Sequence, residues 1–336
     1  MREGSGTNVA WTVAPSHLGG DLLRLRRALH DVGLRVVVDR QLMRHRFVET
    51  GDASRLTRSA NATRTGRGVR VAIIDADGVA EHEAFGTRVS RLDCTTGDGD
   101  PVPDHRLVQA SEGTVVASVA VGAGKCASPA REATLLSYRA STASEIVKAL
   151  RHAMALGSAG PRLVFTAMWV ADDSLYSRFD TDEELPDTIA AVRERGIVLL
   201  AAAGNEGPTG RVRMPAAHPQ VCAVGGWEEA DGQDGPTALD RPHPQSTVDS
   251  EAVGKPTFLA PWGPLRAASI HASDNYAVGS GSSVAVGRAA GIVAAWMESD
   301  PDLDASRMDE ILADPTAWAP LSGLPAATGK GAILER

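Results

Sequence analysis

The sequence predicts an α/β protein built on a mostly parallel sheet with helices on both faces. Segments with helical periodicity separate short apolar runs at residues 69–74, 134–138, 163–169, 197–203 and 221–224. Strands that are apolar on both faces are typical of a parallel sheet covered on both sides. The chain has 336 residues, enough for one large α/β domain with a short appendage.

Helices are expected between and after these runs. Residues 145–156 place apolar side chains on one side, Pro186 opens a helix that Gly196 ends, and Asp304 caps another. A further helix of small residues is expected at 284–297.

Composition shifts along the chain indicate three parts and one long loop. Residues 228–255 are polar and irregular, which predicts a surface loop. In the first part, strand-like residues 8–13 and 34–39 flank a predicted helix at 21–30. The three parts are a small N-terminal α+β unit of residues 1–60, a main domain of 66–320 and a C-terminal tail of 321–336.

The net charge of −8 argues against a nucleic acid or an anionic membrane as partner, because phosphate binding depends on clustered Lys and Arg. We find neither a signal-peptide pattern nor an apolar run long enough to span a bilayer, so a cytoplasmic protein is expected. The three cysteines lack any Cys-x-x-Cys pairing, which excludes a zinc motif and a disulfide framework. The oligomeric state is not indicated.

Polar residues that follow the apolar runs are candidates for chemistry, because ligands gather at the carboxyl ends of parallel strands. Asp75 ends the first run, and no G-x-G-x-x-G follows it, so no dinucleotide is expected. We predict no metal or other cofactor. Gly204 and Asn205 follow a later run, and Ser283 stands at a helix start, where the dipole favours developing negative charge.

Five segments in this order resemble the subtilisin (subtilase) family of serine peptidases over roughly residues 66–320. The resemblance implies a subtilisin-like three-layer fold, with Asp75 as orienting acid, Asn205 as oxyanion donor and Ser283 as nucleophile. The segments are residues 66–75, 201–207, 214–216 with 221–225, 259–261, and 281–291.

The resemblance supplies no general base. Where the family has His-Gly-Thr at a helix start, this chain has Glu112 followed by Gly113 and Thr114. In subtilisin, loss of the base alone lowers turnover about 10⁶-fold. Glutamate, with a reference pKa near 4.3 against about 6.5 for histidine, accepts the serine proton poorly. We expect Ser283 within hydrogen-bond reach of the Glu112 carboxyl, or one water away.

Two questions about the acidic residues remain open: whether Glu112 acts as in a related family, and whether Asp77 joins it. The sedolisins, relatives of the subtilases, use a Ser-Glu-Asp site, but their second acid is replaced here by Val116. Asp77 adds a carboxylate where the family has glycine. Asp75, Asp77 and Glu112 then either lie close together, raising a pKa or recruiting a cation, or Asp77 points to solvent. His82 and His105 are the nearest histidines in sequence, and neither occupies the helix start.

The resemblance also locates the peptide groove. Met168, Trp169 and Val170 stand where the family has a Ser-Leu-Gly segment that binds peptide as an added strand, with Gly204 nearby. These larger side chains, and Trp262 where the family usually has Gly, narrow the groove, unless Trp169 packs in the core.

Two functions follow from this pattern. The first is a cytoplasmic subtilase-fold pseudopeptidase that binds a peptide or protein partner, for instance in the maturation of a small peptide. The alternative is an active hydrolase that uses Ser283, Glu112 and Asp75 on one specific peptide. No residue pattern names the peptide or the pathway.

Overall fold

The structure is a computed structural model, and it describes part of the chain. The chain divides into two units, Met1–Val38 and Asp39–Arg336, and every described residue lies in the second. The strands expected at 8–13 and 34–39 and the helix expected at 21–30 lie outside the described residues. The residues that the structure describes are 42–44, 48–50, 63–97, 99–104, 112–126, 128–170, 184–228, 241–248, 254–269, 273–319 and 330–333.

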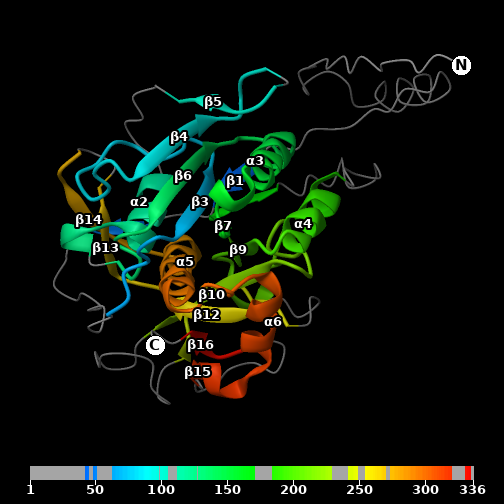
Figure 1. Cartoon of the computed structure of the whole chain (residues 1–336). Coiled ribbons are helices and arrows are strands. Elements are labelled where there is room, and N and C mark those ends of the chain that lie inside the picture. Colours follow the sequence, from blue (N-terminus) through cyan, green and yellow to red (C-terminus); the bar gives the residue numbers. More distant parts are fainter. Residues whose placement is uncertain are drawn as a thin grey trace, which may run out of the picture. The chain divides into compact units, whose positions relative to one another are not determined.

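A mostly parallel sheet forms the centre of the second unit, as the sequence predicts (Figure 1). Its strand order is β15-β16-β12-β10-β9-β7-β3-β6-β4-β5, and β11 pairs with the far part of β10. All neighbours from β16 to β4 are parallel. The strands are β3 (Arg70–Asp75), β4 (Val89–Asp93), β5 (Val102–Pro103), β6 (Thr134–Arg139), β7 (Leu163–Thr166), β9 (Val198–Ala202), β10 (Cys222–Glu228), β11 (Arg241–Pro242), β12 (Phe258–Pro261), β15 (Trp318–Ala319) and β16 (Ala332–Ile333).

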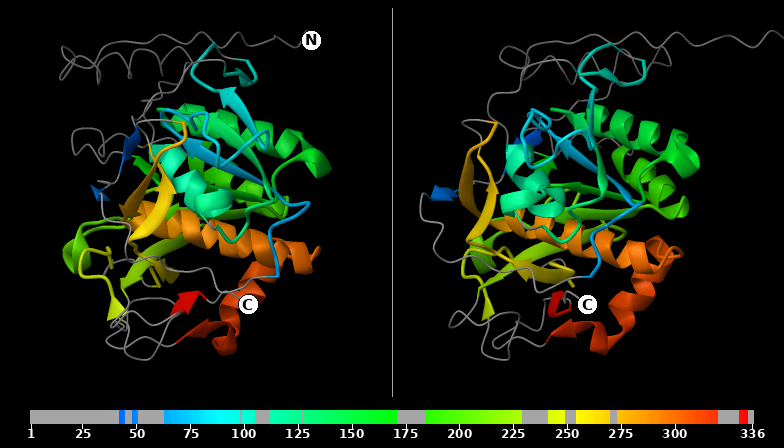
Figure 2. Two further views of the ribbon diagram at one scale, coloured as in Figure 1. Left: turned by 90° about the vertical axis from the view of Figure 1, so that its left-hand side faces the viewer. Right: turned by 60° about the vertical axis from the view of Figure 1, so that its left-hand side comes forward.

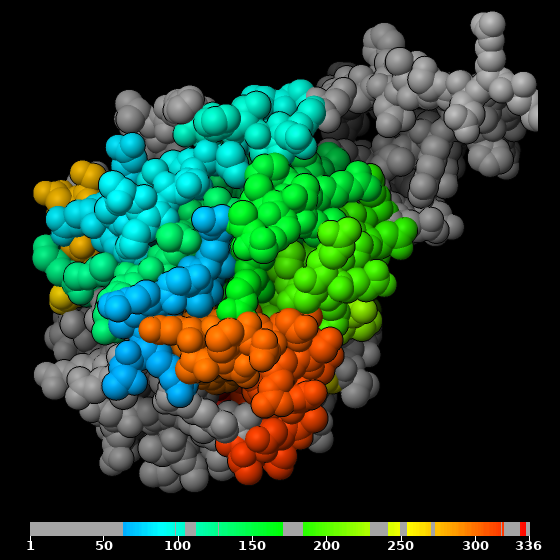
Figure 3. Space-filling view, in the orientation of Figure 1, coloured from blue at the N-terminus to red at the C-terminus, as the bar shows by residue number. Residues whose placement is uncertain are grey.

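Helices cover both faces of this sheet. The described helices are α2 (Glu112–Val121), α3 (Ala143–Ala155), α4 (Glu184–Glu194), α5 (Ser282–Ser299) and α6 (Ala305–Ala313). Figures 1 and 3 show α3 and α4 in green and α5 and α6 in orange. No described helix is long and apolar enough to cross a bilayer.

Alternate residues of the central strands pack into two separate apolar cores, one on each face of the sheet. In β3, Val71 and Ile73 pack with side chains of α2, α5 and α6, whereas Ala72 and Ile74 pack with those of α3 and α4. Each strand therefore buries both faces, which is why the strands read as unbroken apolar runs. The three-layer arrangement confirms the predicted fold class.

The apolar run at 163–169 makes two strands rather than one. The hydroxyl of Thr166 donates to the carbonyl of Ile74 at 2.9 Å and accepts from the backbone N–H of Met168 at 3.1 Å. By satisfying the N–H two residues onward, this side chain lets the backbone leave the main sheet. The run continues as a separate strand, β8 (Met168–Val170).

Two smaller sheets flank the main one, and each includes a strand from residues 42–50. Strand β1 (Leu42–Arg44) pairs antiparallel with β8. Strand β2 (Val48–Thr50) pairs antiparallel with β14 (Tyr276–Ser280), which also pairs with β13 (Leu265–Ala268). Figure 2 shows the blue arrow of β2 beside the gold ribbon of β14.

Candidate active site

Ser283 is the second residue of α5 and is fully buried. Gly281 caps the helix with φ +132°, a left-handed value that favours glycine, and its N–H donates to the carbonyl of Trp262 at 2.9 Å. Next along the chain, the N–H of Ser282 donates to Oδ1 of Asn205 at 2.9 Å. The structure therefore ties Asn205 directly to the serine turn.

The loop that carries Asn205 is bonded to Thr247, a residue that the sequence analysis did not identify as part of the site. Thr247 donates its N–H to the carbonyl of Gly204 at 3.0 Å, and its hydroxyl accepts from the N–H of Glu206 at 3.0 Å. Thr247 is fully buried, although residues 228–255 were expected to form a surface loop. Within the described stretch 241–248, residues 246–248 are buried, whereas Arg241, Pro244 and Gln245 are exposed, so only the end of this stretch packs inward.

Asp75 ends β3 and lies directly against the first turn of α2. A Cβ at Gly113 would stand 2.6 Å from Cγ of Asp75, so only glycine allows this approach. Oδ1 of Asp75 also accepts from the N–H of Asp77 at 3.0 Å, which fixes the carboxylate in a local turn. Asp75 is buried and Asp77 is half-buried.

Helices α2 and α5 run side by side in the same direction. A Cβ at Gly287 would stand 2.5 Å from the carbonyl oxygen of Val116, and one at Gly291 would stand 2.5 Å from that of Ala120. The offset between the helices is the same at both contacts, which are one turn apart. One turn earlier, this offset sets Glu112 opposite Ser283, with both helix N-termini directed at the same point.

The two side chains nevertheless form no direct hydrogen bond. Oγ of Ser283 is buried and bonds to no described residue. The expected direct contact between Ser283 and the Glu112 carboxyl is therefore absent, and the contact through one water stays a prediction. Val116, at the position of the second acid in sedolisins, is a fully buried core residue.

No histidine of the described residues bonds to Ser283. Nε2 of His82 lies 2.7 Å from the carbonyl oxygen of Asn275, and its Nδ1 accepts from the N–H of Ala84 at 3.1 Å. Both ring nitrogens of His82 are thus engaged in the fold. His105, the other histidine considered from sequence, lies outside the described residues.

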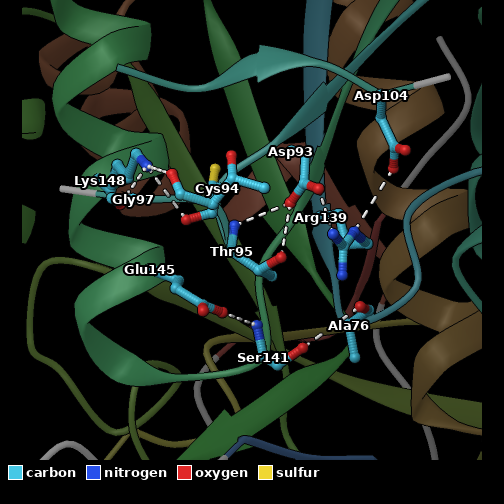
Figure 4. A network of polar contacts seen from close by, with 11 residues as sticks. Ala76, Asp93, Cys94, Thr95, Gly97, Asp104, Arg139, Ser141, Glu145 and Lys148 are labelled. Carbon is cyan, nitrogen blue, oxygen red and sulfur yellow. Dashed lines mark hydrogen bonds and ion pairs between the residues drawn. The ribbon is translucent and has the colours of Figure 1, made fainter. Parts of the chain in front are cut away.

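Arg139 is engaged with two carboxylates, those of Asp93 and Asp104 (Figure 4). Arg139 stands opposite Asp75 in the ladder of β3 and β6, but its guanidinium pairs with Asp93 and lies 3.5 Å from Asp104. It therefore does not turn toward the serine. Among the described residues, no three His, Cys, Asp or Glu side chains are grouped to hold a metal ion, so Asp75, Asp77 and Glu112 form no ligand set.

The groove residues predicted from sequence lie on β8. Met168 and Val170 are buried, whereas Trp169 is half-buried. The guanidinium carbon of Arg213 stands 4.3 Å from the centre of the Trp169 ring, and Nη1 of Arg213 bonds to Oε1 of Glu206 at 2.6 Å. Through this pair, the strand is linked to the loop that carries Asn205.

Trp262 is buried rather than exposed in a groove. Its ring stacks on His243 with centroids 4.2 Å apart and fills the space where a Cβ at Gly226 would stand. Burial lowers the pKa of the His243 imidazole, with the nearby Glu228 carboxylate opposing the shift, so the ring is neutral at pH 7. The stacked pair lies next to the serine turn, because the carbonyl of Trp262 accepts from the N–H of Gly281.

A family model for the subtilases matches residues 66–331 of this chain. The chain belongs to the subtilase family. The family match agrees with the resemblance seen in the sequence. The matched residues include both Asp75 and Ser283.

The chain is also similar to several known proteases. The chain is 26% identical over 297 residues to serine protease AprX of Bacillus subtilis (strain 168), covering 80% of this chain and 65% of AprX. It superposes on the S41 psychrophilic protease with a TM-score of 0.66, at 23% identity, covering 85% of this chain and all of the other. On the prenylagaramide maturation protease PagA, the TM-score is 0.59 at 20% identity, with coverages of 80% and 91%. These superpositions establish the fold alone.

Proposed function

We propose that this subtilase has lost ordinary peptidase activity and binds an extended peptide or protein segment beside Ser283. The observation that carries the proposal is Glu112, the first residue of α2, to which the resemblance to the family assigns the position of the general base. A serine hydroxyl without a base is a very poor nucleophile at neutral pH. The absence of any hydrogen bond from Oγ of Ser283 to a described residue supports the same conclusion.

Peptide binding is supported by β8, which the resemblance assigns to the peptide groove, and by β14, which leads into the serine turn. Strand β8 pairs antiparallel with β1, and β14 pairs antiparallel with β2, so both edges accept an extended backbone. Peptide recognition by strand addition uses main-chain hydrogen bonds and does not need a reactive serine. Loss of the base therefore leaves this part of the site intact.

A role in maturing a small peptide is part of the proposal. PagA is named as the maturation protease of prenylagaramide, and it shares the fold of this chain. The three cysteines are buried and free, which fits a reducing compartment and supports a cytoplasmic protein. The peptide itself is identified here only as an extended segment.

A second candidate is a hydrolase that uses Ser283, Glu112 and Asp75. The tether from Asn205 to Ser282 favours it, because this bond holds the Asn205 side chain beside the serine turn, where an oxyanion donor is needed. Glu112 would then need a water to relay the proton from Ser283. Such an enzyme would be slow at neutral pH, since a carboxylate is a weak base.

A fluorophosphonate probe separates the two functions. An activated Ser283 reacts with the probe, whereas a serine without a base does not. We expect labelling of the wild type at pH 7 to equal that of Ser283→Ala, with intact casein after prolonged incubation. Labelling that disappears in Ser283→Ala, together with casein fragments, would establish the hydrolase instead.

A further inference from the structure

Arg213 connects two parts of the candidate site. Its guanidinium carbon stands 4.3 Å from the centre of the Trp169 ring on β8, and its Nη1 donates to Oε1 of Glu206 at 2.6 Å. Glu206 directly follows Asn205, whose side chain is bonded to the serine turn. The guanidinium therefore lies between the strand that the resemblance assigns to the peptide groove and the loop that reaches Ser283.

The backbone around Arg213 is fixed next to β8. The N–H of Val170 donates to the carbonyl of Met214 at 2.8 Å. The carbonyl of Arg213 accepts from the N–H of Ala217 at 3.0 Å. The preceding residue, Val212, is buried in the same apolar core as Val170, whereas Arg213 is half-buried. The core thus takes the Val212 side chain, and the Arg213 side chain is directed along the outer side of the strand.

Glu206, the ion-pair partner of Arg213, is also held in place. Its N–H donates to Oγ1 of Thr247 at 3.0 Å, and a Cβ at Gly210 would stand 2.5 Å from its own Cβ. The side chain of Arg213 is 21% exposed and that of Glu206 is 41% exposed, so a ligand can reach the pair. A ligand that reaches Arg213 therefore meets a guanidinium whose position is set by an aromatic ring and a carboxylate.

The chemistry that this pair offers to a ligand is that of hydrogen-bond donors. A guanidinium carries its N–H donors in a planar fork that matches a carboxylate. Among the described residues, only Glu206 accepts a hydrogen bond from Arg213, so the guanidinium keeps donors for a ligand. Arg213 covers the Trp169 ring and neutralises Glu206, which leaves neither group open to a cation. Exposed Arg211 adds positive charge to the same segment. The arrangement favours a carboxylate.

We propose that Arg213 selects peptides that carry an acidic side chain, Asp or Glu, in the segment bound beside Ser283. This inference rests on the proposed peptide-binding function and names its substrate class. Glu206 and Trp169 act as positioning residues: they hold the guanidinium, so little side-chain freedom is lost when the carboxylate of the peptide binds. A hydrogen bond between two charged groups of this kind raises affinity by about tenfold.

Selection from a library of short random peptides tests the substrate class. The full chain is used as wild type, as Arg213→Gln, and as the matched control Arg211→Gln, which removes the same charge two residues away. We expect Asp and Glu to be enriched in the peptides that the wild type and Arg211→Gln retain, and not in those that Arg213→Gln retains. Equal acid content for all three proteins, or its loss in both variants, would overturn the selectivity and leave peptide binding intact. Failure of all three proteins to retain any peptide would overturn the proposed function itself.

A double-mutant cycle then assigns the contact to Arg213. The tightest acidic peptide selected by the wild type is synthesised again with its Asp or Glu changed to Asn or Gln. This change should weaken binding to the wild type about tenfold and leave binding to Arg213→Gln unaltered. Arg213→Lys keeps the charge but not the planar fork, so its loss should be smaller, and this variant supplies the comparison if Arg213→Gln does not fold. The same loss in the wild type and both variants would place the acidic side chain elsewhere and overturn the inference.

Discussion

Asn205 accepts a 2.9 Å hydrogen bond at Oδ1 from the backbone N–H of Ser282, one residue before the serine at the centre of the site. The amide of Asn205 is thereby oriented, since its oxygen faces Ser282 and its NH₂ group faces away. Ser282 is fully buried, so this N–H has no access to water. The bond is therefore structural as well as a means of aiming the amide.

Asn205→Leu should destabilise the protein. Leucine has a similar volume but no acceptor, and a buried N–H left unpaired costs about 1–3 kcal/mol in the free energy of unfolding. Asn205→Asp keeps an oxygen at the same position and should lose much less. Denaturant unfolding of the two variants measures the difference. Equal stability of the two would show that the bond to Ser282 contributes nothing.

Glu112→His should create peptidase activity. The α2–α5 offset sets residue 112 opposite Ser283, and the neighbouring Gly113 lies against Asp75, so an imidazole would find both partners. A positioned general base contributes about 10²–10⁴-fold, and casein cleavage should rise by at least about 100-fold. The rate should fall below about pH 6.5, as the imidazole takes up a proton.

The control for this variant is Glu112→Gln, which removes the charge without adding a base. It should cleave casein no faster than the wild type. A folded Glu112→His protein with no gain would mean that Asp77 or the large side chains of β8 also block catalysis. Repeating the assay with Asp77→Gly added distinguishes those two causes.

Gly113→Ala should destabilise the protein even though alanine is the better helix former. Helix propensity alone would stabilise the variant by about 1 kcal/mol. A Cβ would stand 2.6 Å from Cγ of Asp75 and 2.7 Å from the carbonyl oxygen of Gly78, and overpacking of this kind costs about 1–3 kcal/mol. Gly99→Ala, where a Cβ meets nothing within 4 Å, is the matched control. A more stable Gly113→Ala protein would contradict the contact with Asp75.

The sequence was a good guide to the central strands because they are buried on both faces. Strands β3, β6, β9 and β10 fall within one or two residues of the expected starts, although β10 extends four residues further. Strand β4 was missed, because only Asp93 of its five residues is fully buried and the segment shows no apolar run. Local pattern detects a strand only where the environment is uniform along it.

The site was predictable residue by residue but not as an arrangement. Strand ends and a helix start identified Asp75, Asn205 and Ser283 as candidates, and the resemblance to the family added Glu112. Their grouping depends on long-range contacts, such as the approach of α2 and α5 at Gly287, that no local pattern encodes. Thr247 was missed for the same reason, since its polar segment gives no sign that it packs on the Asn205 loop.

Lys255 should make the stability of the protein depend on pH. Its side chain is buried, and Nζ donates to the carbonyls of His218 and Val221 in the turn before β10. Burial lowers its pKa from 10.5 to about 8. Between pH 8 and 10.5 the folded chain releases the proton while the unfolded chain keeps it, so the free energy of unfolding rises with pH.

Lys255→Met isolates this effect, because methionine does not titrate. Relative to the variant, the wild type should gain on the order of 3 kcal/mol between pH 8 and 10.5. Burial also raises the pKa of Cys222 to about 11, which acts in the opposite direction above about pH 9. Cys222 is present in both proteins, but the Lys255 charge lowers its pKa, so its contribution cancels only below about pH 9, where the thiol is protonated in both. Denaturant unfolding at several pH values gives the two curves, and parallel curves would show that the Lys255 ammonium is equally stable in the folded and unfolded chains.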